Sequence, residues 1–306
     1  MPACPEPVRV AGADFGGVIA LPGFGELARA YDGFILDQWG VLHDGTRPYA
    51  GAAECLARLR AAGKRIVVLS NSGKREAENV SLMARMGFEP CLFDRFVSAG
   101  EDARRAIETR ANAFHRGLGS RCYVFTRDGD HALLEGIGLE LVESVDAAEF
   151  LVVLGSDSPR RGCADYEPEL VAGISRKLPM ICANPDVWRF SAHGMIEAAG
   201  VLARRYQALG GMVFYHGKPY PAIYDACFDA LAGCARERIL AVGDSIEHDV
   251  LGAARVGLAC ALIAGGVHAG ELGVRWGELP TLLDFNHLMA GACAKPAYLL
   301  PAFAWS

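Results

Sequence analysis

Short runs of apolar, β-branched residues alternate with helical patterns along most of the chain. The segments RIVVLS (65–70), RILAVGD (238–244) and LACALI (258–263) are continuous apolar runs of the kind that a parallel sheet buries on both faces. Helical apolar spacing occurs between such runs, for example over 50–64 and 221–233. This alternation predicts an α/β fold in which right-handed crossovers connect parallel strands.

Further elements of both kinds are expected along the chain. The remaining predicted strands are 33–41, which runs into a loop, 96–100, 122–126, 139–143, 150–155, 180–184 and 211–218, and the remaining predicted helices are 73–87, 101–114 and 247–256. The segment from about residue 280 onward is rich in Ala, Pro and Leu, and its pattern assigns it no structure. Its aromatic residues leave open whether it covers the core or a neighbouring subunit.

The composition excludes several classes of protein. Of the 306 residues, 52% are hydrophobic and 22% are charged, which excludes a disordered chain, a collagen and a coiled-coil rod. A net charge of −6 and the lack of a long Lys/Arg run argue against nucleic acid or an anionic membrane as a partner. The length favours two domains.

The cysteines and the first residues predict a location. The ten cysteines form no C-x-x-C pair, which argues against a zinc ribbon or a thioredoxin-like site. MPACPEPVRV (1–10) lacks a basic stretch followed by an apolar one, and GGVIALPGF (16–24) is too short to span a bilayer. We therefore expect a reduced cytoplasmic protein without a membrane partner.

Polar residues follow the predicted strands. In a parallel α/β sheet, ligands bind at the carboxyl ends of the strands. The polar residues at or just beyond these ends are Asp37, Ser70, Asn71, Lys218, Asp244 and Asp249. A single Asp after a strand is typical of a helix cap or a turn. The functional prediction therefore depends on the occurrence of all six residues in this order along the chain.

These residue types suit phosphate chemistry. Carboxylates such as Asp37, Asp244 and Asp249 are hard oxygen ligands for Mg²⁺, and a carboxylate left free to attack is a covalent nucleophile. Ser70 with neighbouring backbone N–H groups can hold phosphate oxygens, and Lys218 supplies a compact positive charge.

Four segments together resemble a known family. DQWGVLHDG (37–45), LSNSGKR (69–75), HGKP (216–219) and AVGDSIEHDV (241–250) are similar to motifs one to four of the haloacid dehalogenase-like hydrolase superfamily. ANPD (183–186) resembles subclass IIA, which includes sugar-phosphate, nitrophenyl-phosphate and pyridoxal-phosphate phosphatases. The resemblance covers roughly residues 31–265.

The resemblance implies a Rossmann-like, doubly wound parallel-sheet core with an inserted α/β cap domain. The expected parts are a first core segment over 1–116, with an N-terminal extension over 1–30, a cap over 117–210, and a second core segment with the C-terminal tail over 211–306. Asn184 and Asp186 of the ANPD segment are expected to contribute to the substrate site from the cap. The resemblance is also compatible with a homodimer.

The resemblance also implies roles for the strand-end residues. Asp37 would be the nucleophile that forms an aspartyl-phosphate, and its carboxylate and the backbone carbonyl of Trp39 would face Mg²⁺. Ser70 and Asn71 would bind the phosphoryl group, Lys218 would neutralise charge on Asp37 and phosphate, and Asp244 would ligate Mg²⁺, with Asp249 a ligand or a partner of the ligands.

One position departs from the family pattern. Phosphatases of this superfamily usually carry a second Asp two residues after the nucleophile, and here that position is Trp39. Indole has one N–H donor and no usable base, whereas general acid–base help is worth typically ~10²–10⁴-fold in rate. His43 is a candidate for the missing proton relay, and the alternative is that it caps a turn or stacks on Trp39.

The function predicted from these residues is a Mg²⁺-dependent phosphatase for a small phosphorylated metabolite. The alternative is a weak or inactive protein of the same fold that binds a phosphorylated ligand. Slow phosphotransfer to an alcohol stays open as well.

Two glycine-containing segments match other motifs weakly. GFGELA (23–28) fits a relaxed dinucleotide-binding fingerprint, but Pro22 and a poor preceding strand favour a turn that leads into a helix. GMVFYHGKP (211–219) departs from a nucleotide P-loop in its glycine spacing and in Pro219.

A third match suggests an esterase. GDSI (243–246) and DFNH (284–287) resemble two blocks of a serine esterase family, with Ser245 as nucleophile and His287 as base. The short separation of the two blocks argues against it.

Overall fold

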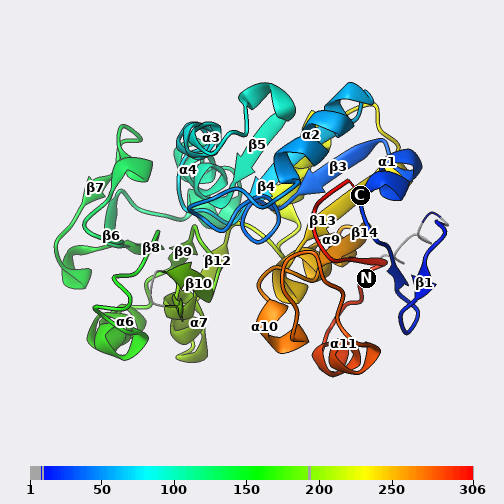
Figure 1. Cartoon of the computed structure of the whole chain (residues 1–306). Helices are drawn as coiled ribbons and strands as arrows, with labels where there is room; N and C mark the ends of the chain where they lie inside the picture. Colours follow the sequence, from blue (N-terminus) through cyan, green and yellow to red (C-terminus); the bar gives the residue numbers. More distant parts are fainter. Residues whose placement is uncertain (1–7, 9, 192–193, 306) are drawn as a thin grey trace. The chain divides into compact units, whose positions relative to one another are not determined.

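The chain forms two compact units in the computed structural model, which describes residues 8, 10–191 and 194–305 (Figure 1). Unit 1 contains the described residues up to 70, residues 80–97 and those from 218 onward, and unit 2 contains residues 71–79 and 98–217. Each unit has its own parallel sheet, so the predicted α/β class is confirmed. The predicted cap boundaries at 117 and 210 stay a prediction.

Unit 1 is built on an eight-stranded sheet in the order β1-β2-β15-β14-β13-β3-β4-β5. The strands are β1 (Ala13–Asp14), β2 (Ile19–Ala20), β3 (Gly33–Leu36), β4 (Arg65–Ser70), β5 (Arg95–Ser98), β13 (Ile239–Gly243), β14 (Ala259–Ile263) and β15 (Tyr298–Leu300). From β2 to β4 every neighbouring pair is parallel, and β1 adds an antiparallel edge.

Helices cover this sheet. They are α1 (Gly25–Ala30), α2 (Ala52–Ala61), α3 (Glu76–Arg85), α8 (Ala222–Ala230), α9 (Leu251–Arg255), α10 (Ala269–Leu272) and α11 (Leu282–Met289). Alternate strand residues such as Phe34, Leu36 and Val68 pack with Leu27 of α1 and Leu56 of α2 in one buried cluster. The strands are buried along nearly their whole length, which explains their continuous apolar sequences.

The register of the central strands brings their carboxyl ends to one edge. Leu36 of β3 lies opposite Val68 of β4 and Val242 of β13, and all three strands are parallel. Asp37, Ser70 and Asp244 therefore stand at the same edge of the sheet, where open α/β sheets bind ligands.

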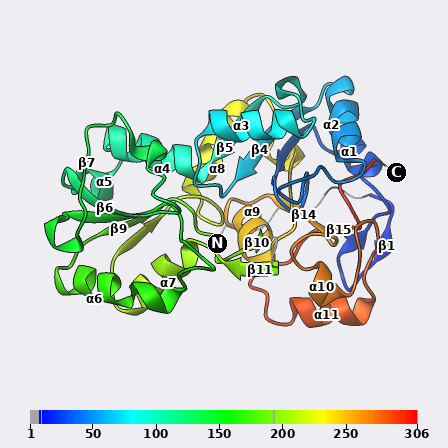
Figure 2. The ribbon, with the colours of Figure 1, turned by 60° about the vertical axis from the view of Figure 1, so that its left-hand side comes forward.

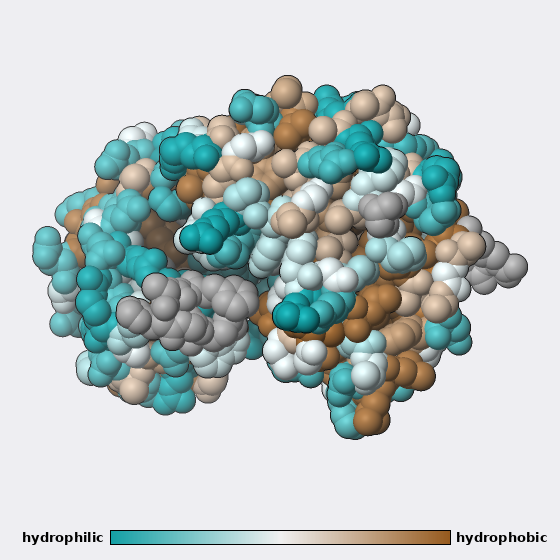
Figure 3. Space-filling view, in the orientation of Figure 1, coloured by the Kyte–Doolittle hydropathy of each residue, from teal (hydrophilic) through white to brown (hydrophobic). Residues whose placement is uncertain are grey.

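The C-terminal segment is part of the core, a result that the sequence pattern left undetermined. β15 is a buried strand between β14 and β2, and the Tyr298 hydroxyl lies 2.9 Å from that of Tyr31. Three leucines on and just before α11 are exposed: Leu279, Leu282 and Leu283. Figure 3 shows apolar area in the part of the molecule where Figure 1 draws α11.

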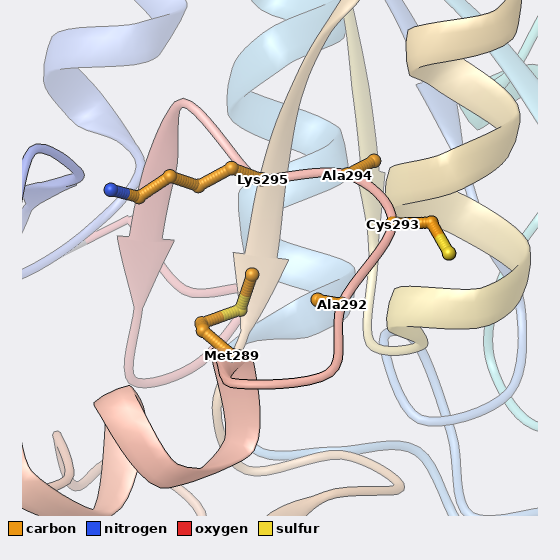
Figure 4. Close-up of a pocket in the computed structure, with 5 residues that line it drawn as sticks. All are labelled: Met289, Ala292, Cys293, Ala294 and Lys295. Carbon is orange, nitrogen blue, oxygen red and sulfur yellow. The ribbon is translucent and has the colours of Figure 1, made fainter.

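The loop between α11 and β15 lines a small pocket with Met289, Ala292, Cys293, Ala294 and Lys295 (Figure 4). The Lys295 side chain points away from Met289 and Cys293, and its ammonium group donates to the Gly16 carbonyl. The pocket lacks the convergent polar groups that fix a ligand, so it does not compete with the sheet edge as a candidate site.

Unit 2 is built on a five-stranded parallel sheet in the order β12-β9-β8-β6-β7. Its strands are β6 (Arg121–Phe125), β7 (Glu140–Leu141), β8 (Phe150–Val153), β9 (Met180–Cys182) and β12 (Val213–Tyr215), and β10 (Trp188–Ser191) with β11 (Gly194–Glu197) forms a separate hairpin. Figure 2 shows α6 (Glu167–Ser175) and α7 (Gly200–Ala208) on one side of this sheet and α4 (Ala99–Thr109) and α5 (Ala113–Arg116) on the other.

The alternation of side chains along β8 explains the two layers of unit 2. Leu151 and Val153 pack in the cluster that contains residues of α6 and α7, and Phe150 and Val152 pack in the cluster that contains residues of α4. Successive side chains of a strand point to opposite faces, so a strand covered by helices on both sides is apolar throughout.

A chain of polar side chains joins α5 to the end of β12 inside unit 2. His216 Nδ1 lies 2.6 Å from Asp102 Oδ2, and its Nε2 lies 3.2 Å from Nε2 of His115. His115 Nδ1 lies 2.9 Å from Oδ1 of Asn112. Burial, followed by the neighbouring His216, lowers the pKa of His115 to about 4, so the buried His115 ring is neutral at physiological pH.

The structure corrects several predicted elements. The helix predicted over 101–114 is broken: Arg110 adopts a left-handed backbone conformation (φ 53°), and Asn112 caps α5 through its side chain. The strand predicted over 139–143 is reduced to β7. The helix predicted over 247–256 begins with a turn of π-helix, Ile246–Val250.

Other expectations concern the cysteines and the membrane. The described cysteines form no disulfide. Within the described residues, no helix is long and apolar enough to cross a bilayer. Most of segment 1–10, on which the absence of a signal peptide was judged, lies outside the described residues.

Candidate active site

A tight loop follows β3 and carries the first candidate residue. The Asp37 backbone N–H donates to Val242 of β13 at 2.8 Å, so the chain leaves the sheet directly after this hydrogen bond. The Gln38 carbonyl accepts the N–H groups of Leu42 and His43, and the N–H of Gly40 donates back to the His43 carbonyl at 3.1 Å. These bonds hold the loop in a fixed conformation at the carboxyl end of β3.

Lys218 connects two carboxylates. Its Nζ lies 2.6 Å from Oδ1 of Asp37 and donates to Oδ1 of Asp249 at 2.7 Å, and the lysine is 3% exposed. A buried ammonium group is tolerated when it is paired and hydrogen-bonded in this way. The geometry therefore holds Asp37 beside a permanent positive charge.

Asp244 completes a compact carboxylate cluster. Ligand oxygens of Asp37, Asp244 and Asp249 all lie within 4.8 Å of one another. Oδ2 of Asp244 accepts the Val267 N–H at 2.6 Å. Oδ2 of Asp249 accepts the Ser245 N–H at 3.0 Å, while its other oxygen faces the lysine. Asp249 thus uses both oxygens within the protein, which favours a supporting role over direct metal ligation.

Gly40 is required by this packing. Its φ is +75°, and a Cβ at this position would lie 1.7 Å from Oδ2 of Asp244. Any side chain here would collide with the carboxylate, and the backbone conformation also favours glycine.

Burial dominates the electrostatics of the cluster. Burial raises the pKa of Asp37 to about 7, against the opposing effect of Lys218. Burial, then Asp37 and Asp249, raises the pKa of Asp244 well above its ordinary value. Burial alone would lower the pKa of Lys218, but the two facing carboxylates raise it above its ordinary value. Three acidic groups share the single ammonium group of Lys218, so the cluster has more negative than positive charge when all three are ionised.

Trp39 and His43 pack on each other beside this cluster. Their rings meet edge to face with centroids 5.6 Å apart, and Trp39 remains 36% exposed. A Cβ on Gly45 (φ +94°) would lie 2.4 Å from Cη2 of Trp39, so the indole lies directly on the glycine backbone.

The contacts of His43 bear on its predicted role as proton relay. Its Nδ1 accepts the Gly45 N–H at 2.9 Å, and the ring is fully buried. Burial lowers the pKa of His43 to about 4. At neutral pH the ring is therefore uncharged and already caps the turn, an arrangement that favours the turn-capping and stacking alternative.

Unit 2 brings together three other predicted residues. Nδ2 of Asn71 donates to Oδ1 of Asp186 at 2.8 Å, and the Asp186 N–H donates to Oδ1 of Asn184 at 3.2 Å. The start of the second motif and the ANPD segment therefore form one polar group, with Asn71 4% exposed. Ser70, the residue before it, belongs to unit 1 and is also buried.

The competing motifs have structural explanations. The Ser245 hydroxyl accepts the His248 N–H and caps the π-turn, the ordinary use of a serine at a helix start. The GFGELA segment forms the turn into α1 that its sequence favoured.

Sequence reasoning missed the backbone groups and the glycine that hold the carboxylates. The N–H of Val267 comes from the loop after β14, and Gly40 allows close approach to Asp244. The glycine pair 265–266 directly after an apolar strand was the available signal, because glycines there permit a backbone to approach a site closely.

Known proteins share this arrangement. A family described as haloacid dehalogenase-like hydrolase matches residues 34–140, and one described as HAD-hydrolase-like matches residues 215–287. The crystal structure of a haloacid dehalogenase-like hydrolase from Brucella suis 1330 is 32% identical, with a TM-score of 0.78, over 92% of this chain and 99% of that one. The chain belongs to the haloacid dehalogenase-like hydrolase family. The resemblance to the superfamily and its subclass IIA is confirmed, and the chain is a hydrolase of this type.

Two further proteins are similar to this chain, and one of them is a phosphatase by name. Human chronophin (Homo sapiens) is 29% identical over 257 residues, 79% of this chain and 83% of that protein. A glycerol phosphate phosphatase of Mycobacterium tuberculosis, crystallised in complex with magnesium, is 21% identical with a TM-score of 0.65 over 89% of this chain and 75% of that one. The latter likeness shows the fold alone.

Proposed function

We propose that this hydrolase is a Mg²⁺-dependent phosphatase that removes phosphate from a small phosphorylated metabolite through an aspartyl-phosphate on Asp37. The observation that carries the proposal is the pair of contacts from Lys218 to Asp37 and Asp249 at the carboxyl edge of the unit 1 sheet. Phosphoryl transfer depends mainly on positioning and on neutralising charge, and a nucleophile held beside a buried ammonium group meets both needs.

The carboxylate cluster fits a divalent cation. Hard oxygen donors within 4.8 Å of one another, buried and sharing one ammonium group, leave negative charge that Mg²⁺ would compensate. Asp37, Asp244 and the backbone carbonyl of Trp39 would hold the ion, and Asp249 would position Lys218. When bound, Mg²⁺ supplies positive charge against phosphate oxygens.

The protein's own residues account for the reaction as follows. A carboxylate oxygen of Asp37 attacks phosphorus, the bond from phosphorus to the ester oxygen breaks, and the alcohol leaves with a proton from solvent. Water then attacks phosphorus of the aspartyl-phosphate, the bond from phosphorus to the Asp37 oxygen breaks, and the proton that the water loses goes to the departing phosphate or to solvent, which restores the carboxylate. Lys218, with Ser70 and Asn71 as proposed phosphoryl ligands, offsets the charge that develops.

The second candidate function is a binding protein of the same fold. It is favoured by Trp39 and by its surroundings, where the buried His43 has a pKa of about 4 and burial raises the pKa of Tyr49 to about 12. Neither group exchanges a proton readily at neutral pH, so turnover would be slow. Phosphotransfer to an alcohol in place of water is the third option.

The test is phosphate release from a panel of phosphorylated metabolites and an aryl phosphate, with Mg²⁺, with EDTA, and with Asp37→Asn. Release that needs Mg²⁺ and disappears in Asp37→Asn supports the phosphatase. No turnover, combined with a Mg²⁺-dependent rise in melting temperature on adding a phosphorylated ligand, supports the binding protein. Cytoplasmic location and a homodimer stay predictions.

A further inference from the structure

The loop that follows β14 packs directly on one carboxylate of the cluster. Its residues 264–268 belong to unit 1, as does the whole cluster. A Cβ on Gly266 would lie 2.2 Å from Cβ of Asp244, and a Cβ on Gly265 would lie 3.0 Å from Cα of Trp276. The loop is therefore confined between Asp244 and the segment that carries Trp276.

Two neighbouring residues of this loop exchange hydrogen bonds with the segment that carries the carboxylates. The Val267 N–H donates to Oδ2 of Asp244 at 2.6 Å. In the opposite direction, the Ile246 N–H donates to Nε2 of His268 at 3.3 Å. The loop thus binds the chain on both sides of Ser245, once as a donor and once as an acceptor.

The Ile246 N–H is one of the backbone donors at a helix start, which have no acceptor in a preceding turn. Ile246 is the first residue of the π-turn Ile246–Val250 and is 7% exposed. A further donor of this start is satisfied locally, because the Ser245 hydroxyl accepts the His248 N–H at 3.2 Å. The Ile246 N–H instead receives a side chain from another loop. Buried donors are normally paired, so the His268 ring has a defined task here.

The turn that is held in this way carries two carboxylates. Oδ2 of Asp249 accepts the Ser245 N–H at 3.0 Å, and its Oδ1 accepts from Lys218 at 2.7 Å. Oδ2 of Asp244 is occupied by the Val267 N–H, whereas Oδ1 of Asp244 accepts no hydrogen bond from the part of the chain that the structure describes. Oδ1 of Asp244 is therefore the oxygen that stays available to a cation.

The His268 ring accepts the Ile246 N–H as a neutral imidazole, because a protonated Nε2 is itself a donor. The ring proton is then on Nδ1, which lies 3.6 Å from Oε1 of Glu271. Burial lowers the pKa of His268, against the opposing effect of Glu271, and this favours the same neutral form. The ring therefore adds no positive charge to the cluster and acts by holding the turn.

We propose that His268 is a positioning residue for the divalent cation of the proposed phosphatase. Its Nε2 holds the segment 244–249 against the loop after β14, so that Oδ2 of Asp244 stays on the Val267 N–H and Oδ1 stays available as a metal ligand. The inference rests on the proposed function, because the cation is the one that Asp37 and Asp244 would share. Replacing a residue that orients metal ligands typically lowers metal affinity by about 10- to 100-fold.

The test compares two amide side chains at position 268 that differ by one methylene group. The side-chain carbonyl of Gln reaches about as far as Nε2 of histidine, whereas that of Asn ends near the position of Nδ1. Thermal unfolding of the EDTA-treated protein, titrated with Mg²⁺ alone, gives the Mg²⁺ affinity from the rise in melting temperature. We expect His268→Asn to weaken Mg²⁺ binding by about 10- to 100-fold and His268→Gln to restore most of it.

Amide hydrogen exchange reports on the hydrogen bond itself. Without metal, the Ile246 amide should exchange faster in His268→Asn than in wild type or in His268→Gln. Thr281→Val is the matched control, because the Thr281 side chain caps α11 with hydrogen bonds to Asp284 alone among the described residues. Its loss removes a cap of the same kind from unit 1, and it should leave both the Mg²⁺ affinity and the Ile246 exchange rate at their wild-type values.

Equal Mg²⁺ affinity in wild type and His268→Asn, or the same loss in His268→Gln or in Thr281→Val, would overturn the inference. The Mg²⁺ titration contains no substrate, so it is separate from turnover. If wild type binds Mg²⁺ but hydrolyses no substrate, the proposed function fails and the comparison of Asn with Gln still decides the role of His268. Mg²⁺-dependent phosphate release with equal Mg²⁺ affinity in all variants supports the phosphatase and rejects the positioning role. A wild type that binds no Mg²⁺ overturns both.

Discussion

Replacing Lys218 by Met should destabilise the metal-free protein strongly. Methionine keeps the length and apolar stem of the lysine but removes its charge. Three buried or mostly buried acidic groups would then face one another without a protein cation. The loss arises from the carboxylates that remain, because an uncompensated buried charge costs more than the ion pair contributed.

The magnitude follows from two contacts. At Nζ–O distances of 2.6 and 2.7 Å, an effective dielectric constant of about 20 gives roughly 6 kcal/mol of Coulomb attraction for each. Desolvation of the charges offsets much of this, and breaking a buried pair on one side costs about 3–5 kcal/mol. We expect the free energy of unfolding to fall by that amount in EDTA at about pH 8.

Lowering the pH should reduce the stability that Lys218→Met loses relative to wild type. Burial keeps the pKa of Asp37 at about 7 and that of Asp244 above its ordinary value, although Lys218 lowers both. In Lys218→Met these carboxyls therefore hold their protons to a higher pH than in wild type. A folded state that binds more protons gains stability as pH falls. The variant should therefore approach wild type between about pH 8 and pH 5, and added Mg²⁺ should act in the same direction by supplying positive charge.

Urea unfolding, monitored by circular dichroism, would measure the free energy of unfolding of wild type and of Lys218→Met. Lys74→Met is the matched control, because Lys74 is 54% exposed and pairs with Glu78 on the helix surface at 3.1 Å, a contact worth about 0.5 kcal/mol. A Lys218→Met loss as small as that of the control in EDTA at about pH 8 would refute the reasoning. So would a loss that does not change with pH or with Mg²⁺.

Three further perturbations test other parts of the structure. His115 should oppose the stability gained from the carboxylate cluster as pH drops from about 6.5 toward 4, because the neutral, buried ring has a folded pKa of about 4 and the unfolded chain binds the extra proton. Relative to wild type, His115→Gln should therefore gain stability in urea unfolding as pH falls across that window. Gly45→Ala should cost about 1–3 kcal/mol and shift Trp39 fluorescence, since its Cβ would meet the indole at 2.4 Å, while Gly63→Ala, with a φ of +72° but no neighbour within 4 Å, reports the backbone strain alone. Tyr298→Phe removes a buried, hydrogen-bonded hydroxyl and should lower the thermal stability by about 1 kcal/mol; no change would mean that the hydroxyl contributes nothing to docking of the last strand.

The sheet edge could be predicted from the sequence because a parallel sheet leaves little freedom. RIVVLS and RILAVGD have no polar face, so they require a position covered on both sides, and parallel neighbours end at the same edge. Asp37, Ser70 and Asp244 then have to meet there. Lys218 was also predicted as a residue just beyond a strand end. Its contact with Asp249 joins a lysine and an aspartate 31 residues apart in the chain, a separation that no local pattern encodes.

Other features had no signal of this kind. β15 is three residues long and stands in a segment rich in Ala and Pro, so it is a strand only because β14 and β2 leave a gap between them. The contact between Asn71 and Asp186 joins two motifs 115 positions apart.

The place of β15 has a consequence for how the protein is made. Ile19 lies beside Tyr298 in the finished sheet, yet the ribosome produces these residues at nearly opposite times in synthesis. Until Tyr298–Leu300 emerges, the nascent chain exposes two open strand edges, β2 on one side and β14 on the other, and such edges invite pairing with other chains. Domains usually fold in the order in which they are translated, but unit 1 has to wait, whereas unit 2, completed at residue 217, has all its strands earlier. A chaperone that shields strand edges would have the most effect on unit 1, and stalled or truncated translation products would aggregate through this gap.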